Sequence, residues 1–328
     1  MIRSYSLSFK MIVLILFQLR SCVCLSSAPS LNEDIRISFR ASKDHYLYGE
    51  PIDVIVEIDN NTTNRLFFGA STLRSAFTFT AQTGANVKRL EPSPVLKGFS
   101  RAVIVAPRRG HEDVLVLNQY LMFREPGSYV ISVASLQPVP FWVGQVRADT
   151  VSYVSVEDAF SVELTAASED QLQAIGERIA ADLHDDEDEV RALAVQKLSV
   201  MQGPTAVRAL STALEDPAPE VRYEAAHALG NIGSREAVKA LVAALESSNA
   251  DTKRRALHEI RKLRVKSALP VVLRLLDNDS ADVRLSALDT IRVIGDETCR
   301  GAVERAMRDD DEMVRQLAEE VYQSLTSP

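Results

Sequence analysis

The second half of the chain repeats itself with a period of 31 residues. Each period holds a short segment whose third residue is basic, and an Ala follows that basic residue three positions later. The five segments begin at Glu189, Glu220, Asp251, Asp282 and Met313. The five alanines are Ala194, Ala225, Ala256, Ala287 and Ala318. A fixed period of about 20–50 residues is typical of solenoids, in which each repeat packs only on its neighbours. This period therefore decides the fold class of residues 168–328.

Each period contains the apolar pattern of two helices. Spacings of three, four and seven put the apolar residues on one helical face. In the first helix these residues are Leu198, Leu229, Ile260, Ile291 and Tyr322, and in the second they include Leu210, Leu241, Val272 and Val303. Glycine and proline separate the helices, as at Gly203, Pro204 and Gly233. Because neither amphipathic helix can bury its apolar stripe alone, we predict ten helices stacked in pairs around one continuous core.

A polar or acidic residue lies six positions before each basic residue, in the turn that precedes the helix. The pairs are Asp185/Arg191, Asp216/Arg222, Ser247/Lys253, Asn278/Arg284 and Asp309/Arg315. An Asp in a turn can accept hydrogen bonds from backbone N–H groups, and an Arg near the helix start can pair with such an Asp within or between repeats. The spacing therefore predicts a structural ladder along the stack.

The segment from Asp216 to Gly233, with its recurring Asp and Val-Arg positions, resembles HEAT repeats of the phycobilisome-lyase type. The resemblance covers residues 168–328, and only the third unit departs from it, with Thr252 in place of Val and Ser247 in place of Asp. It implies an α-solenoid of HEAT-like helix pairs wound into a right-handed superhelix. Most members of the family are adaptors that offer a helix-lined surface to another protein, so the resemblance implies a scaffold.

Two enzymatic branches of this family are the alternative. Deoxyhypusine hydroxylase carries His-Glu pairs directly after its Val-Arg positions and uses them to bind two irons. The equivalent pairs here are Ala192-Leu193, Tyr223-Glu224, Arg254-Arg255, Leu285-Ser286 and Gln316-Leu317. His258-Glu259 lies outside that register, and we expect it to be a surface pair on a helix. A bilin-lyase-like role suits an exported chain with a sandwich domain poorly. We therefore predict no catalytic, cofactor-binding or metal-binding residues.

Residues 33–165 alternate between apolar and polar side chains, with turn residues between the runs. The runs start near Ile35, Val54, Phe77, Arg101, Val114, Tyr129 and Phe160. This pattern predicts an antiparallel β-sandwich, with the charged run Arg108–Asp113 as a loop between strands. Tyr48–Asn60 and Phe123–Val133 resemble strands of immunoglobulin-like bacterial modules. The cysteine pair of antibody domains is absent, so the resemblance implies a module without a disulfide.

Residues 1–28 have the pattern of a signal peptide. Arg3 and Lys10 precede a nine-residue apolar core, Met11–Leu19. Such a core is too short to span a bilayer, which needs roughly 18 apolar residues or more, but it suits a secretory signal. The sequence therefore predicts a secreted or periplasmic, cell-envelope protein. The alternative is a lipoprotein signal, because Leu19–Cys22 resembles a lipobox; Cys22 would then carry a lipid anchor, the one predicted link to a membrane.

Charge is distributed unevenly along the chain. The formal net charge is −8, and residues 168–328 hold 21 Lys/Arg against 30 Asp/Glu. An acidic domain argues against nucleic-acid binding. Against this background the third repeat is basic, with Glu259 as its one acid after Asp251. Its cations are Lys253, Arg254, Arg255, Arg261, Lys262, Arg264 and Lys266, followed by Arg274.

Two explanations of this basic segment remain open from the sequence. It is either a solvated helix face that balances neighbouring acids, or a docking site for an acidic protein partner or an anionic envelope component. Together with the fold, the sequence predicts a non-enzymatic exported scaffold that binds a protein partner and uses no cofactor.

Overall fold

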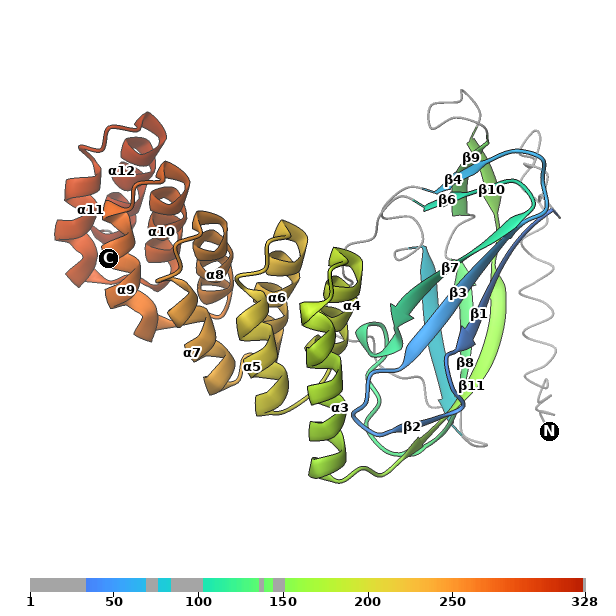
Figure 1. Ribbon diagram of the computed structural model, residues 1–328. Helices are drawn as coiled ribbons and strands as arrows, with labels where there is room; N and C mark the ends of the chain where they lie inside the picture. The colour runs from blue at the N-terminus through green and yellow to red at the C-terminus, as the bar shows by residue number, and fades with distance from the viewer. Residues whose placement is uncertain (1–33, 69–75, 84–102, 136–138, 144–150, 327–328) are drawn as a thin grey trace, which may run out of the picture.

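The computed structural model describes residues 34–68, 76–83, 103–135, 139–143 and 151–326. The predicted signal segment and Cys22 lie outside these residues. A β-rich region comes first and ten α-helices follow it. Figure 1 shows the helices in two rows that lead away from the strands, from α3 and α4 to α11 and α12. The prediction of a β region followed by an α-solenoid of helix pairs is confirmed.

The described strands form three sheets, with the orders β1-β3-β7, β10-β9-β4-β6 and β2-β11-β8-β5. Their bounds are β1 Ile35–Ala41, β2 His45–Leu47, β3 Asp53–Asn60, β4 Leu66–Phe68, β5 Phe77–Thr83, β6 Val103–Val105, β7 Arg109–Val116, β8 Gly127–Ser135, β9 Val139–Val143, β10 Val151–Val154 and β11 Glu157–Thr165. Most pairs are antiparallel, but β2 runs parallel to β11. The resemblance to immunoglobulin-like modules stays a prediction.

Alternation along the strands buries one face of each sheet in a common core. Ile35, Ile37 and Phe39 of β1 point inward, as do the alternate residues of β3. The ring of Phe39 meets that of Phe77 from β5 edge to face, with 4.8 Å between centroids. Such aromatic contacts join two sheets whose strands do not pair with each other.

The prediction of a loop over Arg108–Asp113 is wrong for all but its first residue. Strand β7 begins at Arg109 and pairs with β3 along its length. Glu112 lies directly opposite Glu57, and like charges in such a pair are destabilising. Arg40 on β1 donates to both carboxylates, at 2.6 Å to Glu57 and 3.4 Å to Glu112, and so offsets their repulsion.

The helices follow the 31-residue period. Their bounds are α3 Glu169–Ala181, α4 Asp188–Ser199, α5 Pro204–Ala213, α6 Pro219–Ile232, α7 Arg235–Ala244, α8 Ala250–Lys262, α9 Leu269–Arg274, α10 Ala281–Ile294, α11 Arg300–Ala306 and α12 Glu312–Thr326. Helices α4, α6, α8, α10 and α12 pack on one another in that order and form the first row. None of the described helices is long and apolar enough to cross a membrane.

The repeated small and aliphatic residues form the core of the stack. All five repeated alanines are buried, and so are Leu198, Leu229, Ile260 and Ile291. Thr252, which replaces the usual Val, is also fully buried. Its hydroxyl donates to the carbonyl of Leu214 at the end of α5, at 2.8 Å, so the polar substitution is accommodated without an unsatisfied group.

Arginines at the start of the first-row helices connect consecutive repeats. Arg191 donates through Nη1 to the turn carbonyls of Asp185 and Asp186, at 2.9 and 3.1 Å. Its Nε and Nη2 donate to both carboxylate oxygens of Asp216 in the next repeat, at 2.8 and 3.0 Å. Asp216 also accepts the backbone N–H of Ala218. One guanidinium thus binds both the turn that precedes its own helix and the corresponding turn of the next repeat.

The same arrangement recurs further along the stack. Arg284 donates to the carbonyl of Asn278 and, through two nitrogens, to Asp309 at 2.7 and 2.8 Å. Arg315 donates to the carbonyl of Asp309 at 2.7 Å. Burial favours the neutral form of Asp309, but the hydrogen bonds from Arg284 and from the backbone of Asp311 outweigh it, so the pKa of Asp309 is lowered.

The ladder is interrupted at the third repeat. Ser247 accepts the backbone N–H of Asn249, as the Asp side chains do in other repeats, but it offers no carboxylate to Arg222. Arg222 reaches instead to Asp251 at 3.1 Å, and its buried Nε has no partner among the described residues. Lys253, the basic residue of the third repeat, forms no ion pair with any described residue.

Replacing Ser247 with Asp should restore the missing rung. The new carboxylate would face Arg222 as Asp216 faces Arg191, and it would supply an acceptor for the unpartnered Nε. We expect the free energy of unfolding to rise by about 1.5–3 kcal/mol, the range for a hydrogen bond to a charged group. Denaturant unfolding of the full chain measures this change. Ser248→Asp, an exposed change in the same turn, is the control and should have no such effect.

Candidate functional site

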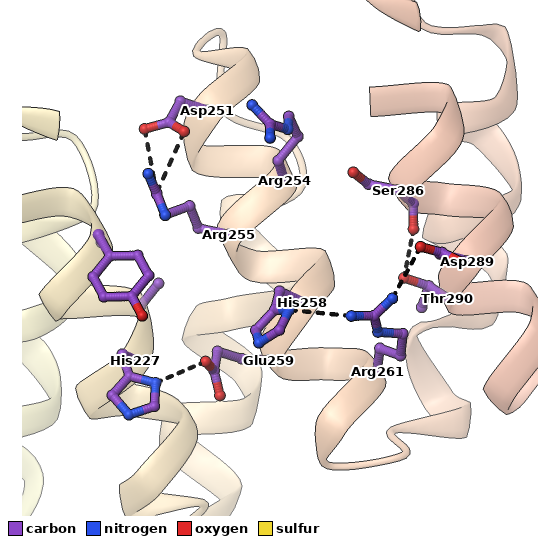
Figure 2. Close-up of a pocket in the computed structure, with 12 residues that line it drawn as sticks. His227, Asp251, Arg254, Arg255, His258, Glu259, Arg261, Ser286, Asp289 and Thr290 are labelled. Carbon is purple, nitrogen blue, oxygen red and sulfur yellow. Dashed lines mark hydrogen bonds and ion pairs between the residues drawn. The ribbon is translucent and has the colours of Figure 1, made fainter. Parts of the chain in front are cut away.

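A pocket of about 270 Å³ lies across three consecutive helices of the first row, α6, α8 and α10. Polar side chains from all three helices line it, as Figure 2 shows. The lining residues are Tyr223, Ala226, His227, Asp251, Arg254, Arg255, His258, Glu259, Arg261, Ser286, Asp289 and Thr290. Helix α8 runs between an α6 side and an α10 side of this pocket.

On the α6 side, Glu259 is almost fully buried where α8 passes Gly230 of α6. A Cβ on Gly230 would lie 2.1 Å from a carboxylate oxygen of Glu259, so this close approach requires glycine. His227 Nδ1 lies 2.9 Å from one oxygen of Glu259, and Lys262 Nζ lies 3.3 Å from the other. Two cationic or donating partners therefore hold the buried carboxylate.

Asn231 completes this network and fixes the orientation of His227. The amide nitrogen of Asn231 lies 3.0 Å from His227 Nε2, and its oxygen accepts from Lys262 at 3.2 Å. An amide nitrogen only donates, so Nε2 accepts and the ring donates from Nδ1 to Glu259. Burial raises the pKa of Glu259, but His227 and Lys262 outweigh it, and the net effect is a lowered pKa.

A row of stacked groups continues from His227 toward the start of α8. The ring of Tyr223 stacks on that of His227, one helical turn away, at 6.1 Å between centroids. The guanidinium of Arg255 lies 4.5 Å from the centre of the Tyr223 ring, a cation–π contact. Arg255 also pairs with Asp251, the carboxylate that Arg222 recruits.

On the α10 side, Arg261 connects two helices. It donates to Asp289 of α10 at 3.0 Å and lies 3.2 Å from His258 Nδ1. The ion pair of Arg254 is longer, with 4.0 Å between its Nη1 and Oδ2 of Asp282, and the side chains of Arg254 and Asp282 are both largely exposed. Ser286 donates to the carbonyl of Asp282, so its hydroxyl hydrogen is committed to the helix.

The structure also holds a second cavity, of about 310 Å³, between the strands and the ends of α4 and α6. Apolar residues such as Phe123 and Met201 form much of its lining. Nearby, Lys197 of α4 and Asp53 of β3 form an ion pair at 2.7 Å, which joins the two parts of the chain. Glu50 is the one charged side chain among its lining residues, whereas arginine, histidine and acidic side chains from three helices line the pocket on α8, so we take the latter as the candidate site.

A family profile for HEAT repeats matches residues 177–256 and 238–323. The helical half is an array of HEAT repeats. The match confirms the family that the sequence pattern indicated for this half. No curated protein matches the sequence.

Several solved structures resemble the HEAT array at low overall similarity. One is the complex of CpcE and CpcF of phycocyanin lyase from Nostoc sp. PCC7120, which matches at 25% identity and a TM-score of 0.37. This match covers 46% of the present chain and 65% of the other chain, which is less than two thirds of its length. A computationally designed armadillo repeat protein for modular peptide recognition matches at 20% identity and a TM-score of 0.31, over 49% and 88% of the two chains. A designed armadillo repeat protein in complex with the peptide (KR)4 matches at 21% and 0.32, over 49% and 87%.

The HEAT array brings together only some of the seven predicted docking cations. Arg254, Arg255 and Arg261 line the pocket, and Lys262 lies beside it on Glu259. Lys253, Arg264 and Lys266 are not among the lining residues. Asp251 of α8 itself and Asp282 and Asp289 of α10 face the lining cations, so the segment is less basic in space than in sequence.

Sequence reasoning predicted only three of the twelve lining residues as site residues, although the repeat contains a signal for others. His227, His258 and Asp289 are spaced by 31 residues and therefore occupy one position of three successive repeats. A polar residue that recurs at one repeat position marks a continuous surface. The expectation of a surface pair at His258-Glu259 is wrong for Glu259, which is 3% exposed and points to α6.

The positions that hold His-Glu pairs in the hydroxylase branch carry other residues in this pocket. They are Tyr223, Arg254, Arg255 and Ser286. Arginine does not ligate metals through its guanidinium, which has donors and no acceptor. Among the described residues, no group of three or more His, Cys, Asp or Glu is placed to hold a metal ion.

Gly230→Ala should disturb the pocket and the stack together. The added methyl group collides with Glu259, so α6 and α8 must separate or the buried carboxylate must leave its two partners. We expect a loss of about 1–3 kcal/mol in the free energy of unfolding, as for overpacked cores. Thermal unfolding followed by circular dichroism measures it.

Gly301→Ala is the matched control for this change. Gly301 also lies in a helix, α11, but nothing surrounds the position of its missing Cβ. An alanine there should stabilise the protein by roughly 0.5–1 kcal/mol, because it restricts the unfolded chain. If both alanines had the same effect, the close approach of Glu259 to Gly230 would not matter for stability.

Proposed function

We propose that this protein is an exported, non-enzymatic scaffold whose HEAT array binds a protein partner in the pocket on α6, α8 and α10. One observation carries the proposal: three consecutive helices contribute half-exposed arginine, histidine, tyrosine and acidic side chains to one concave site. Arg and Tyr are the residue types most enriched where protein interfaces gain their affinity. The immunoglobulin-like region would then position or tether this binding surface.

The chemistry of the lining supports binding over catalysis. Each acid in the pocket is held by a basic partner: Asp251 by Arg255, Glu259 by His227 and Lys262, and Asp289 by Arg261. A general base works best with a pKa near the operating pH, whereas the pKa of Glu259 is lowered. A bilin-lyase-like or hydroxylase-like activity is therefore the disfavoured alternative.

The proposed location follows from the N-terminal sequence. The basic residues and short apolar core of residues 1–28 support export to the envelope or beyond, with Cys22 as the site of an anchor if the signal is of the lipoprotein type. The partner is then a protein of the same compartment. The acidic net charge of the second half supports a protein rather than a nucleic acid.

Photo-crosslinking from the pocket tests this proposal. A benzophenone amino acid in place of Tyr223 keeps an aromatic ring in the site and reacts with whatever contacts it. In the envelope and secreted fractions of the source organism, we expect one discrete protein adduct, which an excess of the unlabelled protein should suppress. Gel mobility followed by mass spectrometry identifies the adduct.

The control places the same amino acid at Lys239, an exposed position on α7 in the second row of helices. That position should give no such adduct. Equal adducts from both positions, or none from position 223 under conditions where the protein is folded and abundant, would contradict the proposed binding surface.

A further inference from the structure

One sheet of the strand region has an apolar outer face. In the sheet β10-β9-β4-β6, alternate side chains of each strand join the core and the others point outward. The outward residues of the described strands are all apolar or aromatic: Phe67, Ile104, Pro140, Trp142, Val151 and Tyr153. By contrast, Arg36 and Arg40 lie on the outer face of β1. A wholly apolar outer face marks a surface that another molecule covers.

Four of these outward residues form a continuous row across the sheet. Ile104 of β6 lies directly opposite Phe67 of β4, and Phe67 lies opposite Trp142 of β9. Trp142 in turn lies opposite Val151 of β10, where the sheet ends. Val151 is 38% exposed, and Tyr153 on the same strand is 36% exposed. The row therefore stops at an exposed residue of an edge strand.

The two ends of this sheet differ in what covers them. At the β6 end, the side chain of Asn60 from β3 donates to the carbonyl of Val105 at 3.2 Å. At the other end, β10 forms backbone hydrogen bonds with β9 and with no other described segment. Figure 1 shows β4, β6, β9 and β10 together at the top of the strand region. The free edge of the sheet is thus β10.

Strand β10 also lacks the residues that usually keep an edge from pairing. Charged side chains and proline on an edge strand oppose the addition of another strand. The first sheet has such charges on both edges, Arg36 and Arg40 on β1 and Arg109 and Glu112 on β7. Strand β10 reads Val-Ser-Tyr-Val, without a charge or a proline. Its free backbone groups are therefore open to a further strand.

A second copy of β10 fits this edge across a two-fold axis. Residues directly opposite each other in an antiparallel pair lie on the same face of the sheet. With the axis at Ser152, Val151 of each copy lies opposite Tyr153 of the other, and a β-branched residue opposite an aromatic one is a favourable pair. Because Tyr153 lies opposite Pro140 within its own chain, this register carries the apolar row across into the second copy.

We propose that this protein forms a two-fold dimer by antiparallel pairing of β10 with β10 of a second copy. Main-chain hydrogen bonds across the edge and the joined apolar row hold the two copies together. A two-fold axis brings each patch against itself, and the described outward residues carry no charge that would meet its own copy. So short a pairing buries less than the roughly 1,200 Å² of stable complexes, so the dimer is reversible.

The dimer concerns the strand region and does not rest on the pocket of the HEAT array. It adds to the proposed function, because one assembly then carries two HEAT arrays and two pockets. A partner with two copies of the recognised segment would bind such an assembly more tightly than it binds one chain.

Sedimentation equilibrium of the full chain over a range of concentrations measures the dimer. Val151→Lys places a charge at the free edge, and the axis repeats the change, so the dissociation constant of the dimer should rise about tenfold. Val130→Lys is the matched control. Val130 also points outward and is 47% exposed, but β8 lies between β11 and β5, so this change should leave the dissociation constant unaltered.

Disulfide formation tests the register of the pair. Chains with Val151→Cys mixed with chains with Tyr153→Cys should form a joint disulfide, because opposite Cα atoms lie about 4.5–5.5 Å apart. Each variant alone should form none, since identical positions then lie diagonally, about 7–8 Å apart. Cys22 and Cys24 are replaced by Ser in both chains, and Cys299 is buried.

Three results would each overturn the inference. They are a chain that is still monomeric at about 1 mM, equal dissociation constants for Val151→Lys and Val130→Lys, and a disulfide of Val151→Cys with itself in preference to Tyr153→Cys. A monomeric chain whose Val151→Lys variant loses a protein adduct would assign the edge to that other protein. The adduct at position 223 is expected from monomer and dimer alike, so loss of the dimer leaves the scaffold standing.

Discussion

The ion pair made by an arginine in the first turn of a first-row helix is the interaction on which the helical half depends. Of the five repeated helices, α8 alone carries Lys253 in place of this arginine. In Arg191 and Arg284 one guanidinium donates to carbonyls of its own turn and to both oxygens of the aspartate in the next turn. The apolar stripes drive the helices together, but hydrophobic contact has no direction. The bidentate pair is directional: it joins an arginine to the aspartate 25 residues later, and so holds consecutive turns, which are 31 residues apart, in register. Among the described residues the bidentate pair forms at two junctions of the row in Figure 1, α4–α6 and α10–α12, and Arg222 forms a single contact to Asp251 at the α6–α8 junction.

The candidate site lies where this regularity is interrupted. Because Ser247 offers no carboxylate, Arg222 turns to Asp251, at the first turn of α8. Asp251 also holds Arg255, which brings that guanidinium over the ring of Tyr223. Asp251 and Arg255, which would otherwise be solvent-exposed residues at the start of α8, thus line one side of the pocket. A local departure from the repeat pattern therefore coincides with the surface to which we assign function, as is common at functional sites.

Much of the fold could be predicted from the sequence, because its period and alternation reflect contacts that are local. The 31-residue period located the helix pairs, and alternation located strands such as β1, β3 and β8. Strands β2, β4, β9 and β10 were missed, since three to five residues show little of a period. Strand β7 was partly taken for a loop, because its charged residues are neutralised by Arg40 from a strand far away in sequence.

The site was less predictable, since it depends on distances between repeats. The linear count of cations found Arg254, Arg255 and Arg261, but it could not show that Asp251 and Asp289 would face two of them. Nor could it show that Glu259 would be buried against Gly230 and held by His227. Comparing the same position in successive repeats, rather than neighbours in sequence, would have brought His227 and Asp289 to attention.

Hydrogen exchange of the Arg284→Met variant tests the role of the ladder most directly. The change leaves the half-buried carboxylate of Asp309 without its two hydrogen bonds from Arg284, which should cost about 1.5–3 kcal/mol. Because each repeat contacts only its neighbours, exchange should accelerate in α10, α11 and α12 and remain unchanged in the strands and in α4. Arg292→Met, on the exposed face of α10, should leave exchange unaltered. Uniform acceleration across the chain, or none in the last three helices, would contradict the account.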